Sequence, residues 1–127
     1  AAGLNIIPTP SSTDGVINKL FPNLAFSAIA FRVPVACGSI ISLEMEFNRR
    51  TSNTDILSAL QCREDVIGYT GEPLVSSDII GDTRSVVIDG LLLKTDGHYA
   101  QIIGWYDNEW GYVNRMVELA IYMGGKL

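Results

Sequence analysis

The sequence predicts an α+β domain, built from a mixed, largely antiparallel sheet with helices on one of its faces. The first observation is the segment Ile41 to Asn48, in which apolar and polar residues alternate strictly. Such alternation is typical of a strand with one buried and one solvated face, and it favours an antiparallel sheet covered on one side only. The second observation is the segment Asn108 to Met123, whose apolar residues recur at helical spacing. Strand-like and helix-like segments in one short chain therefore indicate an α+β fold.

The first part of the chain predicts a helix followed by a strand. Residues Pro8 to Asp14 have the composition of a loop, and Ser12 or Thr13 is suited to cap the helix that follows. Pro22 ends this helix because proline cannot continue the helical hydrogen bonding. The apolar positions on it are Val16, Ile17, Leu20 and Phe21. Residues Phe26 to Val35 are then rich in strand-forming types.

The remainder predicts one short helix, four short strands and a longer final helix. Thr54 is suited to cap a helix that runs to Leu60. Its inward-facing residues are expected to be Ile56, Leu57 and Leu60. The strands, separated or flanked by turns rich in Gly, Pro and Asp, are Val66–Tyr69, Leu74–Ser77, Ser85–Asp89 and Tyr99–Tyr106. The apolar stripe of the final helix consists of Val113, Met116, Val117, Ala120 and Ile121.

The composition describes a single domain that spans residues 1–127. A chain of 127 residues with 47% hydrophobic content can bury one core and is too short for two ordinary domains. Its net charge of -5 argues against a nucleic-acid-binding protein, which needs a basic face. No apolar run reaches the roughly 18 to 20 residues that span a bilayer, so no membrane association is expected. The chain opens inside an apolar stretch, so we expect Ala1 to be a truncation or a boundary within a longer protein.

The sequence contains few residues that could carry catalysis or bind a metal. Cys37 and Cys62 are too few for a zinc site, which needs about four close ligands, so no metal is expected and both should be free thiols in a reducing compartment. A reactive thiol needs a helix N-terminus, a histidine or a cation beside it, and the sequence around Cys37 offers none. His98 follows Asp96 and Gly97 in an expected hairpin turn, where an exposed histidine is the simpler interpretation. No glycine-rich dinucleotide fingerprint is present. We therefore predict no catalytic residue in this chain.

Two segments remain as candidate binding sites. The cluster Thr9 to Thr13 precedes a helix, where free N–H groups, hydroxyls and the helix dipole favour an anion, although most such clusters are simple caps. Asn108 opens the final helix within the aromatic segment Trp105 to Tyr112. Its amide has both a donor and an acceptor, which suits recognition of a carboxamide, and nearby aromatic residues can pack against a flat ring. The alternative is a helix cap flanked by core aromatics.

The segment Trp105 to Tyr112 resembles the signature that precedes the last helix of phosphorylating glyceraldehyde-3-phosphate dehydrogenases. Three further segments match that family in the same order along the chain: Ala1–Thr9 resembles the lead into its phosphate-binding helix, Phe31–Val35 its arginine-bearing strand, and Pro73–Asp78 a later strand. Together these matches cover nearly the whole chain, to about Met123.

The resemblance implies a C-terminal part of the catalytic domain of an NAD-dependent enzyme of glycolysis, with the N-terminal dinucleotide-binding domain absent. In the family, a cysteine attacks the aldehyde, a histidine takes the proton, NAD receives the hydride and phosphate releases the product. Carried over to this chain, Asn108 and Tyr112 would hold the nicotinamide, and Arg32 and Ser11 would bind phosphate groups. The nucleophile and the base lie upstream of Ala1, so the lone chain is expected to be inactive. The implied partners are a phosphorylated aldehyde, inorganic phosphate and further copies of the chain, in the cytoplasm.

The chain also departs from the family pattern, which leaves alternatives open. Where the family reads Ser-Thr-Gly, this chain has Pro10, Ser11 and Ser12, and without the glycine the backbone approaches an anion less closely. The chain is shorter than the family before Ala28 and between Leu60 and Val66. One alternative is a fragment of the related erythrose-4-phosphate dehydrogenase; another is a non-enzymatic interaction module that reuses the fold.

Overall fold

The computed structural model of the chain describes residues 2–126, apart from the side chains of Ala2 and Cys62. The expectation of an inert thiol at Cys62 therefore lies outside the described side chains. The chain divides between Ala36 and Cys37 into two compact units, and each is described by itself. That the whole chain behaves as a single domain stays a prediction.

The N-terminal unit is a two-stranded antiparallel ribbon with an inserted helix. Its elements are η1 (Ala2–Leu4), β1 (Ile7–Pro10), α1 (Thr13–Leu20) and β2 (Ile29–Arg32). In the ribbon Ile7 lies opposite Arg32, and Pro10 lies opposite Ile29. The helix forms where it was predicted, but neither predicted cap is used: Ser12 makes no side-chain cap bond, and the hydroxyl of Ser11 instead accepts from the Thr13 N–H at 3.2 Å.

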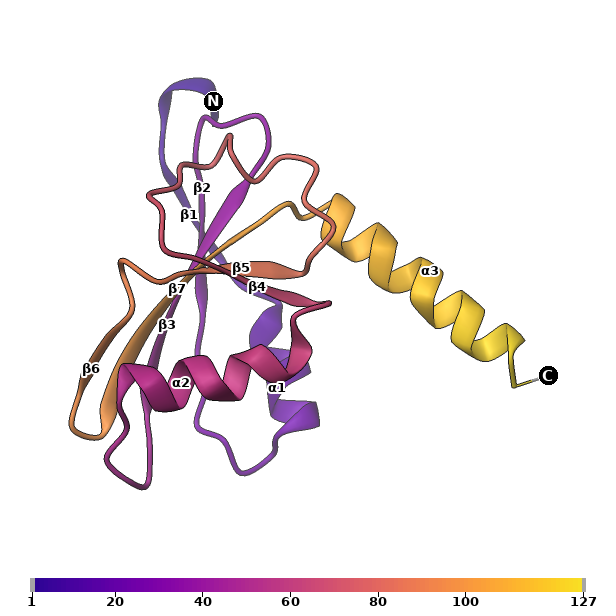
Figure 1. Cartoon of the computed structure of the whole chain (residues 1–127). Helices are drawn as coiled ribbons and strands as arrows, with labels where there is room; N and C mark the ends of the chain where they lie inside the picture. Colours follow the sequence, from indigo (N-terminus) through magenta and orange to yellow (C-terminus); the bar gives the residue numbers. More distant parts are fainter. Residues whose placement is uncertain (1, 127) are drawn as a thin grey trace. The chain divides into compact units, whose positions relative to one another are not determined.

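The C-terminal unit is a five-stranded sheet arranged around β7 (Tyr99–Tyr106). β3 (Ser39–Glu46) pairs antiparallel with the whole length of β7, from Ser39 opposite Tyr106 to Glu46 opposite Tyr99. The other edge of β7 pairs antiparallel first with β6 (Lys94–Asp96) and then with β5 (Val86–Asp89), while β4 (Ile67–Thr70) runs parallel to β5 (Figure 1). The predicted α+β fold with a mixed, largely antiparallel sheet is thus confirmed.

Two of the observed strands were not predicted, and one predicted strand does not form. β1 overlaps the segment Pro8–Asp14, which was predicted as a loop, and it forms because its residues pair with β2. β6 was not predicted, because three residues are too few to show an alternating pattern. Leu74–Ser77 was predicted as a strand and is a turn instead. There the Asp78 carboxylate accepts the Val75 N–H at 2.8 Å, while the Asp78 N–H donates to the Val75 carbonyl at 3.0 Å. These local bonds use backbone groups that a sheet would otherwise pair.

The helix α2 (Asn53–Leu60), continued by η2 (Gln61–Arg63), begins two residues earlier than predicted. Ser52 caps it, not Thr54. The Ser52 hydroxyl accepts from the Asp55 N–H at 3.2 Å, and the Asp55 carboxylate accepts from the Ser52 N–H at 2.9 Å. This reciprocal capping box satisfies two free donors of the first turn, which a lone threonine at position 54 cannot do.

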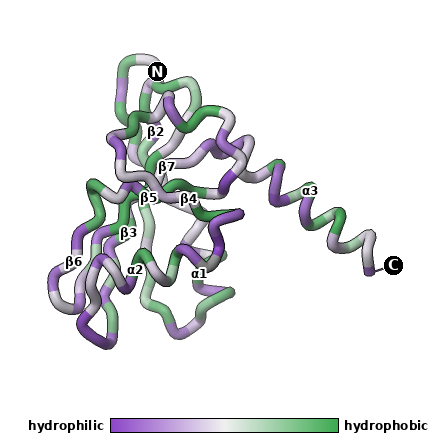
Figure 2. Tube along the Cα trace, viewed as in Figure 1, coloured by the Kyte–Doolittle hydropathy of each residue, from purple (hydrophilic) through white to green (hydrophobic). Residues whose placement is uncertain are grey.

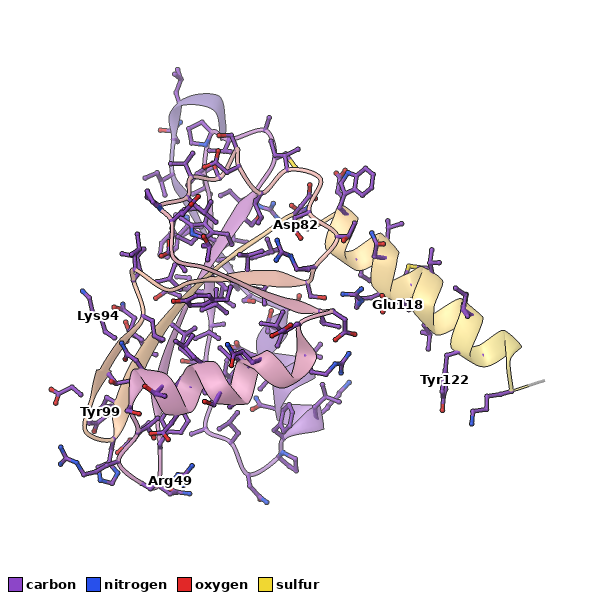
Figure 3. All side chains as sticks on the ribbon, viewed as in Figure 1. Arg49, Asp82, Lys94, Tyr99, Glu118 and Tyr122 are labelled. Carbon is purple, nitrogen blue, oxygen red and sulfur yellow. The ribbon has the colours of Figure 1, made fainter. Side chains whose placement is uncertain are left out.

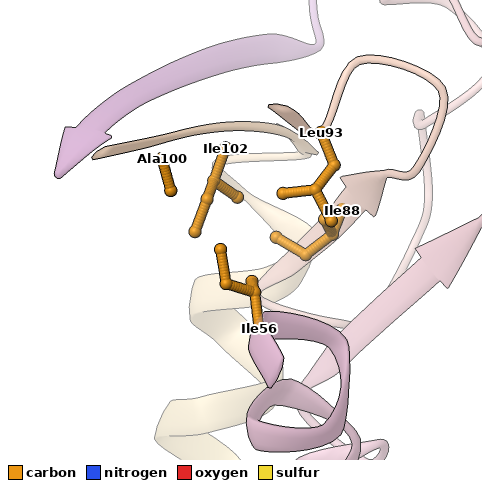
Figure 4. Close-up of a cluster of buried hydrophobic side chains, with 5 residues drawn as sticks. All are labelled: Ile56, Ile88, Leu93, Ala100 and Ile102. Atoms are coloured by element: carbon orange, nitrogen blue, oxygen red, sulfur yellow. The ribbon is translucent and has the colours of Figure 1, made fainter. Parts of the chain in front are cut away.

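The core lies between α2 and one face of the sheet (Figure 4). Ile56 of α2 is 6% exposed, and it clusters with buried residues of the sheet and its connections. These are Ile88, Leu93, Ala100 and Ile102. Leu57 and Leu60 pack against this cluster, as predicted, and so do Leu43 and Phe47. The alternation along β3 is only partly realised, however, because Ile41 and Met45 on the same face remain more than a third exposed.

The helix α3 (Trp110–Gly124) forms close to its predicted bounds, but its apolar stripe is not buried. Figure 2 shows hydrophobic residues recurring along this helix. Val113, Met116, Val117 and Ile121 are each more than half exposed. The predicted stripe is therefore present, but within the described residues it lies outside the core. None of the described helices combines the length and apolar character needed to cross a membrane.

We expect Ile56→Ala to lower the free energy of unfolding by about 2 to 5 kcal/mol, since it removes the α2 side chain at the centre of the core cluster. Urea denaturation followed by circular dichroism measures the change. Ile121→Ala is the matched control: that side chain is 69% exposed, so its loss should stay within about 0.5 kcal/mol. Equal losses in the two variants would contradict the assignment of the core.

Candidate functional site

The two residues predicted to bind phosphate lie at opposite ends of the β1–β2 ribbon. Arg32 ends β2 opposite Ile7, whereas Ser11 directly follows Pro10 at the far end of β1. The four residue-to-residue steps from Ile7 to Ser11 span about 13 Å at the usual rise of a strand. Arg32 is exposed, and its guanidinium forms no ion pair within the described part of the chain.

The face of the ribbon that carries Arg32 leads toward Ser11. Side chains alternate along a strand, so Ile7 and Thr9 share one face with Arg32 and Ala30 across the ladder, and Ser11 lies just beyond the end of β1. Thr9 and Ala30, which lie opposite each other between the two ends, have short side chains. An extended Arg32 side chain directed along this face therefore meets little steric obstruction on its way toward Ser11.

The two residues predicted to face the nicotinamide lie at the start of α3. Asn108 is exposed and comes two residues before the helix. Tyr112 is 65% exposed in the first turn. A spacing of four residues places two side chains on the same side of a helix, so Asn108 and Tyr112 project from neighbouring positions there. The Asn108 amide makes no hydrogen bond with the described residues, which leaves both its donor and its acceptor available.

The residue before Asn108 carries the densest set of polar contacts around this site. Asp107 is 1% exposed. Its Oδ1 accepts the N–H groups of Glu109 at 2.9 Å and Trp110 at 3.0 Å. Its Oδ2 accepts the N–H of Gly81 at 2.9 Å and the thiol of Cys37 at 3.6 Å. Hydrogen bonds from these N–H groups hold the pKa of the Asp107 carboxyl below its usual 3.8, and the bond from Gly81 makes the largest contribution.

Sequence reasoning missed Asp107, although a signal was present. An aspartate just before an amphipathic segment is a strong N-cap candidate, and Glu109, the residue that directly precedes α3, forms no side-chain cap bond. The Asp107 carbonyl also accepts the Gly111 N–H at 3.1 Å, so the hydrogen bonding of the first turn begins at Asp107. The contacts to Gly81 and Cys37 carry no local signal, because their partners lie 26 and 70 residues away.

Two glycines let the surrounding loops approach Asp107. Gly81, whose N–H bonds to the carboxylate, has a φ of +84°, a conformation that costs a residue with a Cβ roughly 1 to 2 kcal/mol. Gly38, next to Cys37, has a φ of +86°, and a Cβ there would lie 2.1 Å from the Ser76 carbonyl oxygen. Neither position tolerates an ordinary side chain without a shift in the backbone.

The first two turns of α3 are also tied to the segment that leads into β5. Gly111 is buried, and a Cβ at this position would come within 2.9 Å of the Arg84 carbonyl oxygen. The Arg115 guanidinium donates to the Ser85 hydroxyl at 3.2 Å and forms an ion pair with Glu118, which is labelled in Figure 3. The start of the helix is therefore fixed while its later turns remain exposed.

Cys37 and His98, the two side chains weighed as catalytic from the sequence, lie in different surroundings. Partial burial raises the pKa of the Cys37 thiol above its ordinary 9.0, and the carboxylates of Asp107 and Glu109 add to the rise. His98 is exposed in the β6–β7 turn, as predicted, and its Nδ1 lies 2.9 Å from the Phe47 carbonyl oxygen. Within residues 2–126 no cluster of His, Cys, Asp and Glu is arranged to hold a metal.

Comparison with known proteins identifies relatives for nearly all of this chain. A family model described as glyceraldehyde 3-phosphate dehydrogenase, C-terminal domain, matches residues 1–108. Glyceraldehyde-3-phosphate dehydrogenase 2 of Streptomyces arenae is 40% identical over 134 residues, which covers 100% of this chain and 40% of the relative. Glyceraldehyde-3-phosphate dehydrogenase 1 of Streptomyces avermitilis gives the same figures, and the Mycobacterium avium glyceraldehyde-3-phosphate dehydrogenase is 37% identical with the same coverage. The chain thus spans about two fifths of the length of these relatives.

We expect the Cys37 thiol to react slowly with iodoacetamide at neutral pH, because its raised pKa leaves little thiolate. The measurement uses a Cys62→Ser variant, so that Cys37 is the labelled thiol, and follows the mass of the product over time. The same variant in denaturant is the control and should label faster. The rate for the folded chain should rise as the pH exceeds 9.0. Equal rates for folded and denatured chains would contradict the environment assigned to Cys37.

Proposed function

This chain belongs to the glyceraldehyde-3-phosphate dehydrogenase family, and from that premise we propose that it is the C-terminal part of the catalytic domain of an NAD-dependent, phosphorylating dehydrogenase. The observation that carries the proposal is the exposed pair Asn108 and Tyr112 at a fixed helix start, inside the signature segment of the family. The alignment with full dehydrogenases along the whole chain supports the same conclusion.

The residues at the start of α3 fit the nicotinamide end of NAD. A carboxamide needs one acceptor and one donor, and the free side-chain amide of Asn108 supplies both. The Tyr112 ring projects from the neighbouring position and offers a flat surface for the nicotinamide ring. When bound, NAD would supply the acceptor for a hydride. The role of this chain would be to orient the ring through Asn108.

The β1–β2 ribbon would bind a phosphate group of the substrate or inorganic phosphate. Arg32 is exposed and offers a planar guanidinium, which can donate two parallel bonds to an anion. Ser11 offers a hydroxyl just beyond the end of β1, although its oxygen already accepts the Thr13 N–H. The hydroxyl proton stays available for a phosphate oxygen, so Ser11 can serve as cap and ligand together.

The lone chain would not carry out the reaction, because none of the described side chains suits the role of nucleophile. Cys37 is held in its neutral thiol form beside a carboxylate, which opposes formation of a thiolate. The residues that attack the aldehyde and take up the proton would come from the portion of the relatives that this chain does not span.

The aldehyde is proposed to be glyceraldehyde-3-phosphate. The relatives carry that name, whereas the alternative of an erythrose-4-phosphate dehydrogenase rests on the altered segment at Pro10 to Ser12. A non-enzymatic module is favoured by a different observation: the apolar stripe of α3 is exposed and offers a surface for a partner. Activity measurements separate these alternatives.

We further propose that the protein self-associates and acts in the cytoplasm. One face of the sheet, opposite the one that α2 covers, carries Ile40 and Tyr99 with exposed fractions of 53% and 59%. Glu44 and Glu46 lie on that same face, near Lys94 of β6. A sheet face that mixes apolar and charged side chains of both signs suits contact with a second copy.

The function is tested by an assay for NADH formation from glyceraldehyde-3-phosphate, NAD and phosphate. We expect the complete product of the gene that encodes this chain to turn over and to prefer this aldehyde to erythrose-4-phosphate. Asn108→Ala should raise KM for NAD by about tenfold, the equivalent of one lost hydrogen bond of about 1.4 kcal/mol. The purified 127-residue chain should show no turnover. Turnover by the lone chain, or none by the complete product, would overturn the proposal.

Self-association is tested by multi-angle light scattering on the purified chain. We expect a mass above that of one chain, rising with concentration. Tyr99→Lys should shift the distribution toward the single chain, since it places a charge on the open face of the sheet. Ser58→Lys, on the exposed side of α2 and away from the open face of the sheet, is the control and should leave the mass unchanged. A monodisperse single chain at high concentration would argue against the interface.

A further inference from the structure

We propose that Asp107 is the positioning residue for Asn108, and that its buried carboxylate fixes the start of α3 against the turn at Gly81. The inference rests on the proposed function, because it gives Asn108 its task at the nicotinamide. The observation behind it is the convergence of three separate segments, around residues 37–38, 79–82 and 107–111, on one side chain.

The carboxylate of Asp107 is both buried and fully engaged. At 1% exposure it has lost its contact with water, a loss that is costly for a charge unless hydrogen bonds replace the water. Each of its oxygens accepts two bonds, from Glu109 and Trp110 at Oδ1 and from Gly81 and Cys37 at Oδ2. The loss of any one of these four donors therefore weakens the remaining hydrogen bonds to the carboxylate, so the four bonds are cooperative.

Asn108 is enclosed by these bonds without taking part in them. It lies between Asp107, which accepts the bonds, and Glu109 and Trp110, which donate to it. The Gly111 N–H donates to the Asp107 carbonyl and closes a second ring around the same peptide. The backbone of Asn108 is thus held on both sides, while its side chain stays exposed and free to bind. A ligand that binds there meets a group already in place.

The two oxygens of Asp107 have different tasks. The bonds at Oδ1 are an ordinary helix cap, which Ser, Thr or Asn would also provide. The bonds at Oδ2 join the helix start to Gly81 and Cys37, far away in the sequence. An asparagine at position 107 would keep one acceptor oxygen. Its NH₂ group would replace the other oxygen, and the two donors on that side would lose their acceptor. The second acceptor is therefore what requires an aspartate, and it is what distinguishes positioning from simple capping.

The chain provides a matched control in Asp89. Asp89 is 2% exposed, and its Oδ1 accepts the N–H groups of Leu91 and Leu92 at 3.1 and 3.2 Å. Its Oδ2 accepts the indole N–H of Trp105 at 3.0 Å. It is thus a second buried aspartate that caps a turn and makes a long-range bond, but its hydrogen bonds reach none of the residues 107–111. Asp89→Asn imposes the same chemical change as Asp107→Asn at another place.

The test is NMR spectroscopy of the ¹⁵N-labelled 127-residue chain in three forms: unmodified, Asp107→Asn and Asp89→Asn. We expect Asp107→Asn to speed amide exchange at Gly81 by about tenfold or more, as for the loss of one buried hydrogen bond. The ¹H–¹⁵N heteronuclear NOE of the Asn108 backbone should fall in the same variant. Asp89→Asn should change the Trp105 indole signal and leave Gly81 and Asn108 as they were. An unchanged Asn108 in Asp107→Asn, or an equal change in Asp89→Asn, would overturn the proposal.

A measurement without substitution of Asp107 covers the case in which Asp107→Asn does not fold. In a Glu109→Gln background, which removes the carboxyl group next to Asn108 on its C-terminal side, the pH is lowered and the amide signals are followed. The signals of Trp110 and the Asn108 side-chain amide should move with one midpoint below 3.8, since both depend on the Asp107 carboxylate. Gly81 does not serve as a reporter, because the carboxyl group of Asp82, whose pKa is also lowered, directly follows it. An Asn108 amide that does not follow this midpoint would count against the proposal.

Addition of NAD to the unmodified chain separates this inference from the proposed function. If NAD shifts the Asn108 side-chain amide and Asp107→Asn weakens that response, both are supported. If NAD leaves Asn108 unchanged, the nicotinamide role loses its support, and the positioning role is decided by the exchange and NOE results alone.

Discussion

The pairing of β7 along both of its edges is the constraint on which the C-terminal unit depends. β3 occupies one edge for eight residues, and β6 and β5 share the other edge, so this strand fixes the position of three others. Its inward residues Ala100 and Ile102 form the base of the core against Ile56 of α2. The strand ends at Tyr106, and the next residue is Asp107. The position of β7 in the sheet therefore also determines where α3 begins.

A buried aspartate stands at the end of two strands of the C-terminal unit: Asp89 at the end of β5 and Asp107 directly after β7. Asp89 closes β5 by capping the turn that follows and by accepting the Trp105 indole from β7. Asp107 does the same after β7, with Gly81 and Cys37 as its distant partners. In both cases a charge is removed from water, and three or more donors offset the cost. Such groups specify one arrangement of the loops more strictly than apolar contacts do, because a misplaced loop leaves a buried charge without a partner.

The apolar stripe of α3 is exposed because the contacts that hold the helix are confined to its first two turns. Gly111 and Arg115 hold the helix through its first two turns, while Val113, Val117 and Ile121 face outward. A helix with so much apolar exposure is stabilised further when something covers it. The relatives are more than twice as long as this chain, so that covering surface is consistent with a place in a larger protein. Asn108 and Tyr112, the pair proposed to contact the nicotinamide, lie at the end of the helix that this chain fixes by itself.

The sequence by itself determined the elements whose pattern is local. The alternation along β3, the bounds of β7 and the existence of all three α-helices follow from periodicity, and the segment Trp105 to Tyr112 names the family. Tertiary structure decided what depends on distant partners. It replaced the predicted strand at Leu74 with a turn, added the short β6 beside β7, and left the stripe of α3 exposed. Above all it gave Asp107 its role, since bonds to residues 26 and 70 positions away leave no trace in local spacing. Periodicity records which side of an element is apolar, whereas only the folded chain determines what meets that side.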